Sequence, residues 1–218
     1  MINTVFNLQL LCASLIMLSI ILMHIVKKNS TLVTAYILQS LGLVVLLGSG
    51  AIQEKSFGLL VVTAIMFVIK IIVAPSLFIR LIKKSHLNLS ASTYLNIPLT
   101  LSILLGILVF SQSDILTPLL TLLPVIPQIK TILISGILMS LFLIINRKGA
   151  LSQIIGVLSL ENTIFVFGIF LGVRQLSALE IGLLFDVFFW IVVSSVFVTM
   201  IYRNFGSFDI SKLNQLKK

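Results

Sequence analysis

The sequence predicts an all-α integral membrane protein, a bundle of about seven transmembrane helices. Of its 218 residues, 59% are hydrophobic and only 10% are charged. Soluble chains typically carry about 25% charged residues. The mean hydropathy is +1.22, and apolar windows of ~20 residues recur along the whole chain. A soluble protein with a single membrane anchor is therefore excluded.

The apolar runs define the expected spans. They cover residues 4–26, 32–51, 57–82, 94–111, 129–145, 152–173 and 179–202. Prolines interrupt the apolar segment between the fourth and fifth runs, and the pieces between them are too short to cross a bilayer. The interrupting residues are Pro118, Pro124 and Pro127. We expect this segment to lie on the membrane surface or against the bundle.

The basic residues favour one side of the membrane. The loops after the first, third and fifth spans, together with the tail, hold eleven of the fifteen: Lys27, Lys28, Arg80, Lys83, Lys84, Arg147, Lys148, Arg203, Lys212, Lys217 and Lys218. By the positive-inside rule, the N-terminus is outside and the C-terminus is cytoplasmic. The net charge of +9 does not indicate a nucleic-acid partner, because there is no basic stripe interleaved with aromatic residues.

The chain divides into three parts on this reading. Residues 1–128 form an N-terminal region of four helices with the proline-rich connecting segment. Residues 129–205 form a region of three helices, and residues 206–218 form a cytoplasmic tail. No internal repeat of the kind found in many secondary transporters is evident.

Three ionisable residues fall within the expected spans. Glu161 and Lys70 lie near the bilayer centre, and Asp186 lies roughly two turns below the outer face. An acid at mid-depth costs about 2.5–3.5 kcal/mol on insertion scales. Such residues mark proton relays by default, with structural pairing as the alternative. We therefore expect Lys70, Glu161 and Asp186 to form a relay, with Lys70 and Glu161 on one connected polar path.

Two features support a polar site around these residues. Pro75 removes a backbone donor close to Lys70 and disturbs its helix, which suggests a hydrated spot. Gln39 and Asn96 are expected to form hydrogen bonds across helices. For His24 and His86, at span ends, interfacial anchoring is the simplest interpretation.

Several kinds of chemistry have no motif in this sequence. There is no P-loop, dinucleotide fingerprint, nucleophile elbow or paired-histidine metal motif. Cys12 is the single cysteine, which excludes a disulfide framework. We expect no catalytic site, no metal site and no bound cofactor in this chain.

The charged segments also resemble a known family. The stretches 67–75 (FVIKIIVAP), 159–162 (SLEN) and 179–189 (LEIGLLFDVFF) are similar in content and order to hydrogenase-4 component E. That family is a membrane subunit of hydrogenases of the formate-hydrogenlyase type. The resemblance covers most of the chain, and the charged intramembrane positions carry it.

The last three spans further resemble the K subunit of respiratory complex I and the C subunit of multisubunit cation/proton antiporters. Arg147 and Lys148 match the family's basic loop pair, and Gly156 and Asn162 match its second helix in spacing. The acid departs from the pattern: Glu161 lies three residues after the family's position, about one turn along the same face. Asp186 is only a candidate for the family's second acid, because its surroundings are bulky.

The resemblance implies a function. It implies a membrane-arm subunit in the bacterial inner membrane, beside antiporter-like subunits and a peripheral redox module, coupling electron transfer to proton or sodium movement without a redox cofactor of its own. Lys70, Glu161 and Asp186 would form the relay, with Gln39, Asn162, Arg147 and Lys148 as supporting polar residues. The alternatives are a subunit of a multisubunit antiporter, a stand-alone small transporter, or a structural anchor in which the buried charges only hold the bundle together.

Overall fold

The structure is a computed structural model, and it describes residues 2–84, 92–116, 118, 121 and 125–171. The regular elements of this part are helical. They are α1 (Ile2–Ile25), α2 (Asn29–Gln53), α3 (Phe57–Phe67), the π-helical turn η1 (Val68–Val73), α4 (Ala74–Lys84), α5 (Ile97–Phe110), the 3-10 turn η2 (Asp114–Leu116), α7 (Pro127–Asn146) and α8 (Ala150–Phe170). The predicted last span (179–202), the tail, Asp186 and His86 lie outside the described residues.

The all-helical prediction is confirmed for this part of the chain, but the count of spans is confirmed only partly. Among the described residues, five helices are long and apolar enough to cross a membrane: Asn7–Ile25, Asn29–Gln53, Phe57–Arg80, Pro127–Asn146 and Leu151–Phe170. They match the first, second, third, fifth and sixth predicted spans. Within the predicted fourth span lies the shorter α5, whose 14 residues reach roughly 21 Å, less than the ~30 Å hydrocarbon core.

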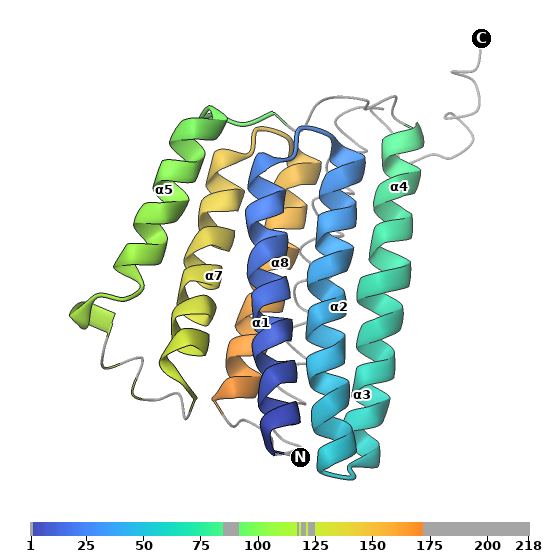
Figure 1. Cartoon of the computed structure of the whole chain (residues 1–218). Helices are drawn as coiled ribbons and strands as arrows, with labels where there is room; N and C mark the ends of the chain where they lie inside the picture. Colours follow the sequence, from blue (N-terminus) through green and yellow to red (C-terminus); the bar gives the residue numbers. More distant parts are fainter. Residues whose placement is uncertain (1, 85–91, 117, 119–120, 122–124, 172–218) are drawn as a thin grey trace. The chain divides into compact units, whose positions relative to one another are not determined.

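Four helices surround a common interior. α1 packs against α2 and α7, and α8 packs against the same two helices from the other side. In Figure 1, α1 lies in front of α8, with α7 and α2 flanking them. The continuous α3–η1–α4 helix packs on the outer side of α2, and α5 packs on α7. This arrangement places η1 beside α2, and α2 in turn contacts α8.

Glycines allow the closest helix contacts. A Cβ atom on Gly156 of α8 would lie 2.9 Å from Ile144 Cγ1 and 3.3 Å from the Ile144 backbone of α7. A Cβ atom on Gly42 of α2 would lie 3.0 Å from Ile16 Cγ1 of α1. Small residues at such contacts let helices approach closely in a membrane, where apolar burial alone gives little driving force between helices.

Helix starts carry conventional signals. The side chain of Ser56 accepts a hydrogen bond from Leu59 N at the start of α3, and Asn96 accepts one from Leu99 N at the start of α5. These contacts satisfy backbone donors that have no partner in the first helical turn. The expectation that Asn96 bonds across helices is therefore wrong, because its side chain caps its own helix.

Three connections meet at one end of the bundle. Thr93 and Arg147 form an isolated antiparallel bridge. Tyr94 N donates to Asn146 O at 2.9 Å, and Lys148 N donates to Ser92 O at 3.1 Å. Arg147 also reaches Val26 after α1. The alternating topology places these three connections on one side, as found; which side of the membrane that is stays a prediction.

His24 is not an interfacial anchor, contrary to expectation. Its side chain is 2% exposed, and its Nε2–H donates to Met139 O at 3.0 Å. Its ring stacks on Phe142 with a centroid distance of 5.2 Å. The position of His24 near the end of α1 suggested an anchor, but α7 covers that face of the helix.

The close α7–α8 contact yields a stability prediction. We expect Gly156→Val to destabilise the protein by about 1–3 kcal/mol, as overpacking typically does. A matched control on the same helix is Gly168→Val, because an added Cβ there meets nothing within 4 Å. Thermal unfolding in detergent measures both variants, and equal midpoints would contradict the close packing at Gly156.

The predicted orientation is tested by accessibility. In a Cys12→Ser background, we expect Lys55→Cys to react with a membrane-impermeant maleimide added to intact cells. Lys28→Cys should react only after permeabilisation, because it lies at the other end of α2. Both lysines are exposed. Labelling in the reverse order would place the N-terminus inside.

Candidate functional site

Lys70 projects from a widened turn of its helix. It lies within η1, and its side chain is 1% exposed. Ala74 N donates to Ile69 O, five residues back, in place of the usual four. The next residue, Pro75, has no N–H, and its ring would clash with the carbonyl four residues earlier in a regular α-helix. The disturbance expected near Pro75 is thus present as a π-helical turn, a feature frequent at functional sites.

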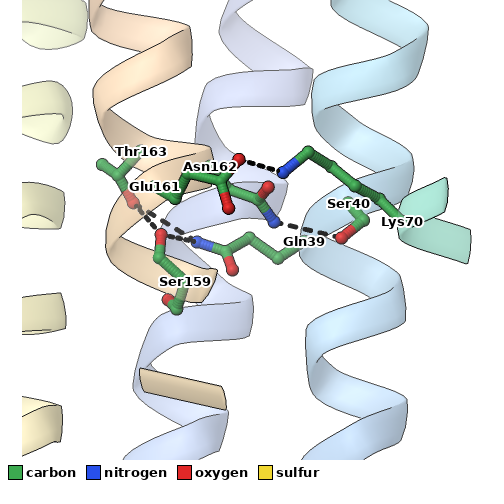
Figure 2. Close-up of polar contacts among 7 residues, drawn as sticks. All are labelled: Gln39, Ser40, Lys70, Ser159, Glu161, Asn162 and Thr163. Carbon is green, nitrogen blue, oxygen red and sulfur yellow. Dashed lines mark hydrogen bonds and ion pairs between the residues drawn. The ribbon is translucent and has the colours of Figure 1, made fainter. Parts of the chain in front are cut away.

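Lys70 and Glu161 form a buried ion pair. Lys70 Nζ lies 2.5 Å from Glu161 Oε1, and both side chains are 1% exposed. Figure 2 shows Lys70 reaching from its helix to Glu161 on α8. The pair joins two segments 91 residues apart in the sequence. Neither residue faces the outside of the bundle, so the two mid-depth charges predicted from the sequence lie together.

Each charge depends on the other for its stability. Placing an isolated ion in a low-dielectric interior costs several kcal/mol, and a close opposite charge offsets much of that cost. Removing one partner of such a pair typically destabilises a protein by about 3–5 kcal/mol. Replacing both by neutral residues is often tolerated. The pair is therefore weak evidence for a purely stabilising role.

A network of amides and hydroxyls connects α2 with α8 at the same level. Gln39 Nε2 donates to Ser159 O at 3.1 Å and to Thr163 Oγ1 at 3.3 Å. Asn162 Nδ2 donates to Ser40 Oγ at 3.0 Å. All five residues are at most 1% exposed. The two amides thus bridge the helices in opposite directions: Gln39 of α2 donates to α8, and Asn162 of α8 donates to α2. Both lie close to Glu161 (Figure 2).

The network continues to α7 through Ser140. Its Oγ lies 3.2 Å from Ser159 Oγ and 3.4 Å from Thr163 Oγ1. Gly136, one turn away, keeps α7 close, since a Cβ there would lie 2.9 Å from Thr163 Cγ2. We call the ion pair and this network the polar row: Lys70, Glu161, Asn162, Ser40, Gln39, Thr163, Ser159 and Ser140.

The sequence found part of this row. Gln39 forms the expected bonds across helices, and Asn162 lies next to Glu161 as a polar neighbour. Ser40, Ser140 and Ser159 were missed, because single serines are common in membrane helices. The four-residue spacing of Ser159 and Thr163 was an available signal, since it places both on one face of α8.

Arg147 and Lys148, the expected basic loop pair, differ in their burial. Arg147 is fully buried, and its Nη1 donates to Val26 O at 3.0 Å. Its Nη2 donates to Val26 O and Met23 O. These carbonyls end α1 and have no partner within that helix, so Arg147 caps its C-terminus. Lys148 is exposed, with Nζ 5.1 Å from the centre of the Tyr94 ring.

The basic pair does not contact the ion pair. Glu161 lies about three turns along α8 from the end where Arg147 stands. Burial lowers the pKa of Arg147 to about 10, so its guanidinium stays protonated near neutral pH. The structure thus assigns Arg147 a capping contact at the bundle end, separate from the polar row.

Comparison with known proteins supports the sequence resemblance. No protein-family model matches the chain, and no solved structure matches it. Relatives named hydrogenase-4 component E, from Escherichia coli K12, Escherichia coli O157:H7 and Shigella flexneri, are each 24% identical over 208 residues. These alignments cover 94% of this chain and 95% of each relative.

The match leaves the finer resemblance open. The similarity of residues 129–205 to the complex I K subunit stays a prediction, and the role of Asp186 falls outside the described residues. Over nearly its whole length, however, the chain is similar to hydrogenase-4 component E, as the motifs around Lys70 and Glu161 indicated.

Proposed function

We propose that this chain is a membrane subunit of a hydrogenase complex that helps couple redox chemistry to proton or sodium translocation. The similarity to hydrogenase-4 component E supports membership of such a complex. The observation that carries the coupling role is the 2.5 Å contact between Lys70 Nζ and Glu161 Oε1, whose side chains are both 1% exposed.

The pair offers a simple proton exchange. Transfer of a proton from Lys70 Nζ to Glu161 Oε1 converts the ion pair into a neutral amine and a neutral carboxylic acid. Burial favours neutral forms over charged ones, so the exchange is less costly here than in water. The amine can then accept a proton from one side while the acid releases one to the other. The sum moves one proton and restores the ion pair.

The proposal extends to partners and location. Antiporter-like membrane subunits would lie next to this chain in the bacterial inner membrane, and a peripheral redox module would supply the driving reaction. A charge that changes in a neighbouring subunit would bias the exchange, because electrostatic interactions are strong in a low dielectric. Asp186 would extend the relay from the last predicted span. The subunit itself would bind no cofactor.

A charge swap separates a relay from a structural anchor. We expect Glu161→Gln and Lys70→Met to lose most redox-driven proton translocation in membrane vesicles from the native host. The double variant Lys70→Glu/Glu161→Lys keeps a possible ion pair but moves the carboxylate from α8 to η1. We expect it to assemble better than either single variant and still to fail in translocation.

The comparison needs an assembly readout and a control. Copurification of the other subunits reports assembly, and Lys83→Met, at an exposed position, should translocate normally. If the swapped pair restores translocation together with assembly, the two charges only hold the helices together and the chain is a scaffold.

A further inference from the structure

The interior between α1, α2, α7 and α8 differs along its length. Each of these helices carries a buried polar residue nearer the end that holds Arg147, and a buried apolar residue farther from it. The polar residues, in chain order, are His24, Gln39, Ser140 and Ser159. The apolar residues are Ile16, Leu43, Leu133 and Val166, which belong to one hydrophobic cluster.

The polar half also contains hydrogen-bond acceptors that the described residues do not satisfy. Gln39 Oε1 and Asn162 Oδ1 are buried and receive no hydrogen bond within this part of the chain. The carbonyl of Ser159 can only accept, which fixes the Gln39 amide with its nitrogen toward α8. Buried acceptors in native proteins are usually satisfied by protein or ordered water. Water is the donor that we expect at these acceptors.

His24 contributes a third acceptor of this kind. Met139 O can only accept, so the Nε2 of His24 carries the proton. Nδ1 is then the lone-pair nitrogen of a neutral ring, and it too is buried without a partner among the described residues. His24 lies between the residues whose carbonyls bind Arg147, Met23 and Val26. A basic nitrogen thus stands between the bundle end and the polar row.

We infer that protons reach the Lys70–Glu161 pair from the Arg147 end, through a hydrated interior in which His24 is the first acceptor. A proton from water at that end binds Nδ1, and the same nitrogen releases a proton to water near Ser140, which restores the neutral ring with its Nε2–H on Met139 O. The apolar cluster beyond Gln39 closes the opposite end. This inference rests on the proposed coupling function.

Two His24 variants test the inference. His24→Phe removes proton acceptance, and His24→Gln removes it while retaining an amide donor for Met139 O. We expect both to lower redox-driven proton uptake by at least about tenfold in vesicles containing the whole complex, since positioned proton-transfer groups typically contribute about 10²–10⁴-fold. Assembly should persist in the glutamine variant. If His24 only holds α1 against α7, glutamine restores uptake and the inference is overturned.

A second pair of variants tests the route on α7. Ser140→Ala removes a hydroxyl that bonds across to α8 in the polar row. Ser135→Ala removes a buried hydroxyl outside that row, which bonds to Thr131 O of its own helix and to Met17 Sδ of α1. We expect only the first to lower uptake. Normal uptake in both would exclude Ser140 from the route and overturn the inference.

The outcomes separate this inference from the proposed function. If Glu161→Gln abolishes translocation while the His24 and Ser140 variants translocate normally, the pair is a relay with another access path. If none of these variants affects translocation, the proposed function itself fails. If all of them lower it while the Ser135 control does not, both stand.

Discussion

The described bundle is organised around a lysine and a glutamate that cannot be buried separately. Lys70 Nζ and Glu161 Oε1 lie 2.5 Å apart with both side chains 1% exposed, and each charge offsets the other's desolvation. This constraint links the outer α3–η1–α4 helix with α8 and fixes the rotation of both about their axes. Lys70 lies in the π-helical turn before Pro75, and this turn determines the direction in which Lys70 leaves its helix.

The surrounding polar residues extend outward from that pair to α2 and α7. Gln39 and Asn162 cross between α2 and α8 beside it, and Ser140 extends the network to α7. Most of these groups are neutral, so they add little Coulombic stabilisation. Their contribution is orientation, together with acceptor sites at which water can bind inside the bundle. A packed apolar interface would hold the same helices together but would offer no path for a proton.

The sequence predicted the elements better than the contacts. Length and hydropathy located five spans, because a membrane requires ~20 apolar residues in a helix. The charges were located for the same reason: an ionisable residue stands out against an apolar run. Pairing was harder, since Lys70 and Glu161 are 91 residues apart and no local pattern encodes which helices adjoin. His24 was expected to be an interfacial anchor and Arg147 to be one of a basic loop pair; the burial of both was not predicted, because burial by a neighbouring helix leaves no trace in their own segments.

Direction is the property that an isolated ion pair cannot supply. A buried pair open to both ends would let protons equilibrate across the membrane and dissipate the gradient. The described interior is asymmetric. His24, Gln39, Ser140 and Ser159 lie toward the Arg147 end, whereas the cluster that contains Ile16, Leu43, Leu133 and Val166 lies farther from it, with Ser135 among the buried residues there. Under the proposed coupling function, a second opening would form only when the redox reaction occurs. Because α3–η1–α4 packs on the outer side of α2, Lys70 is the partner of the pair that stands on an outer helix, and a displacement of that helix would separate the two charges.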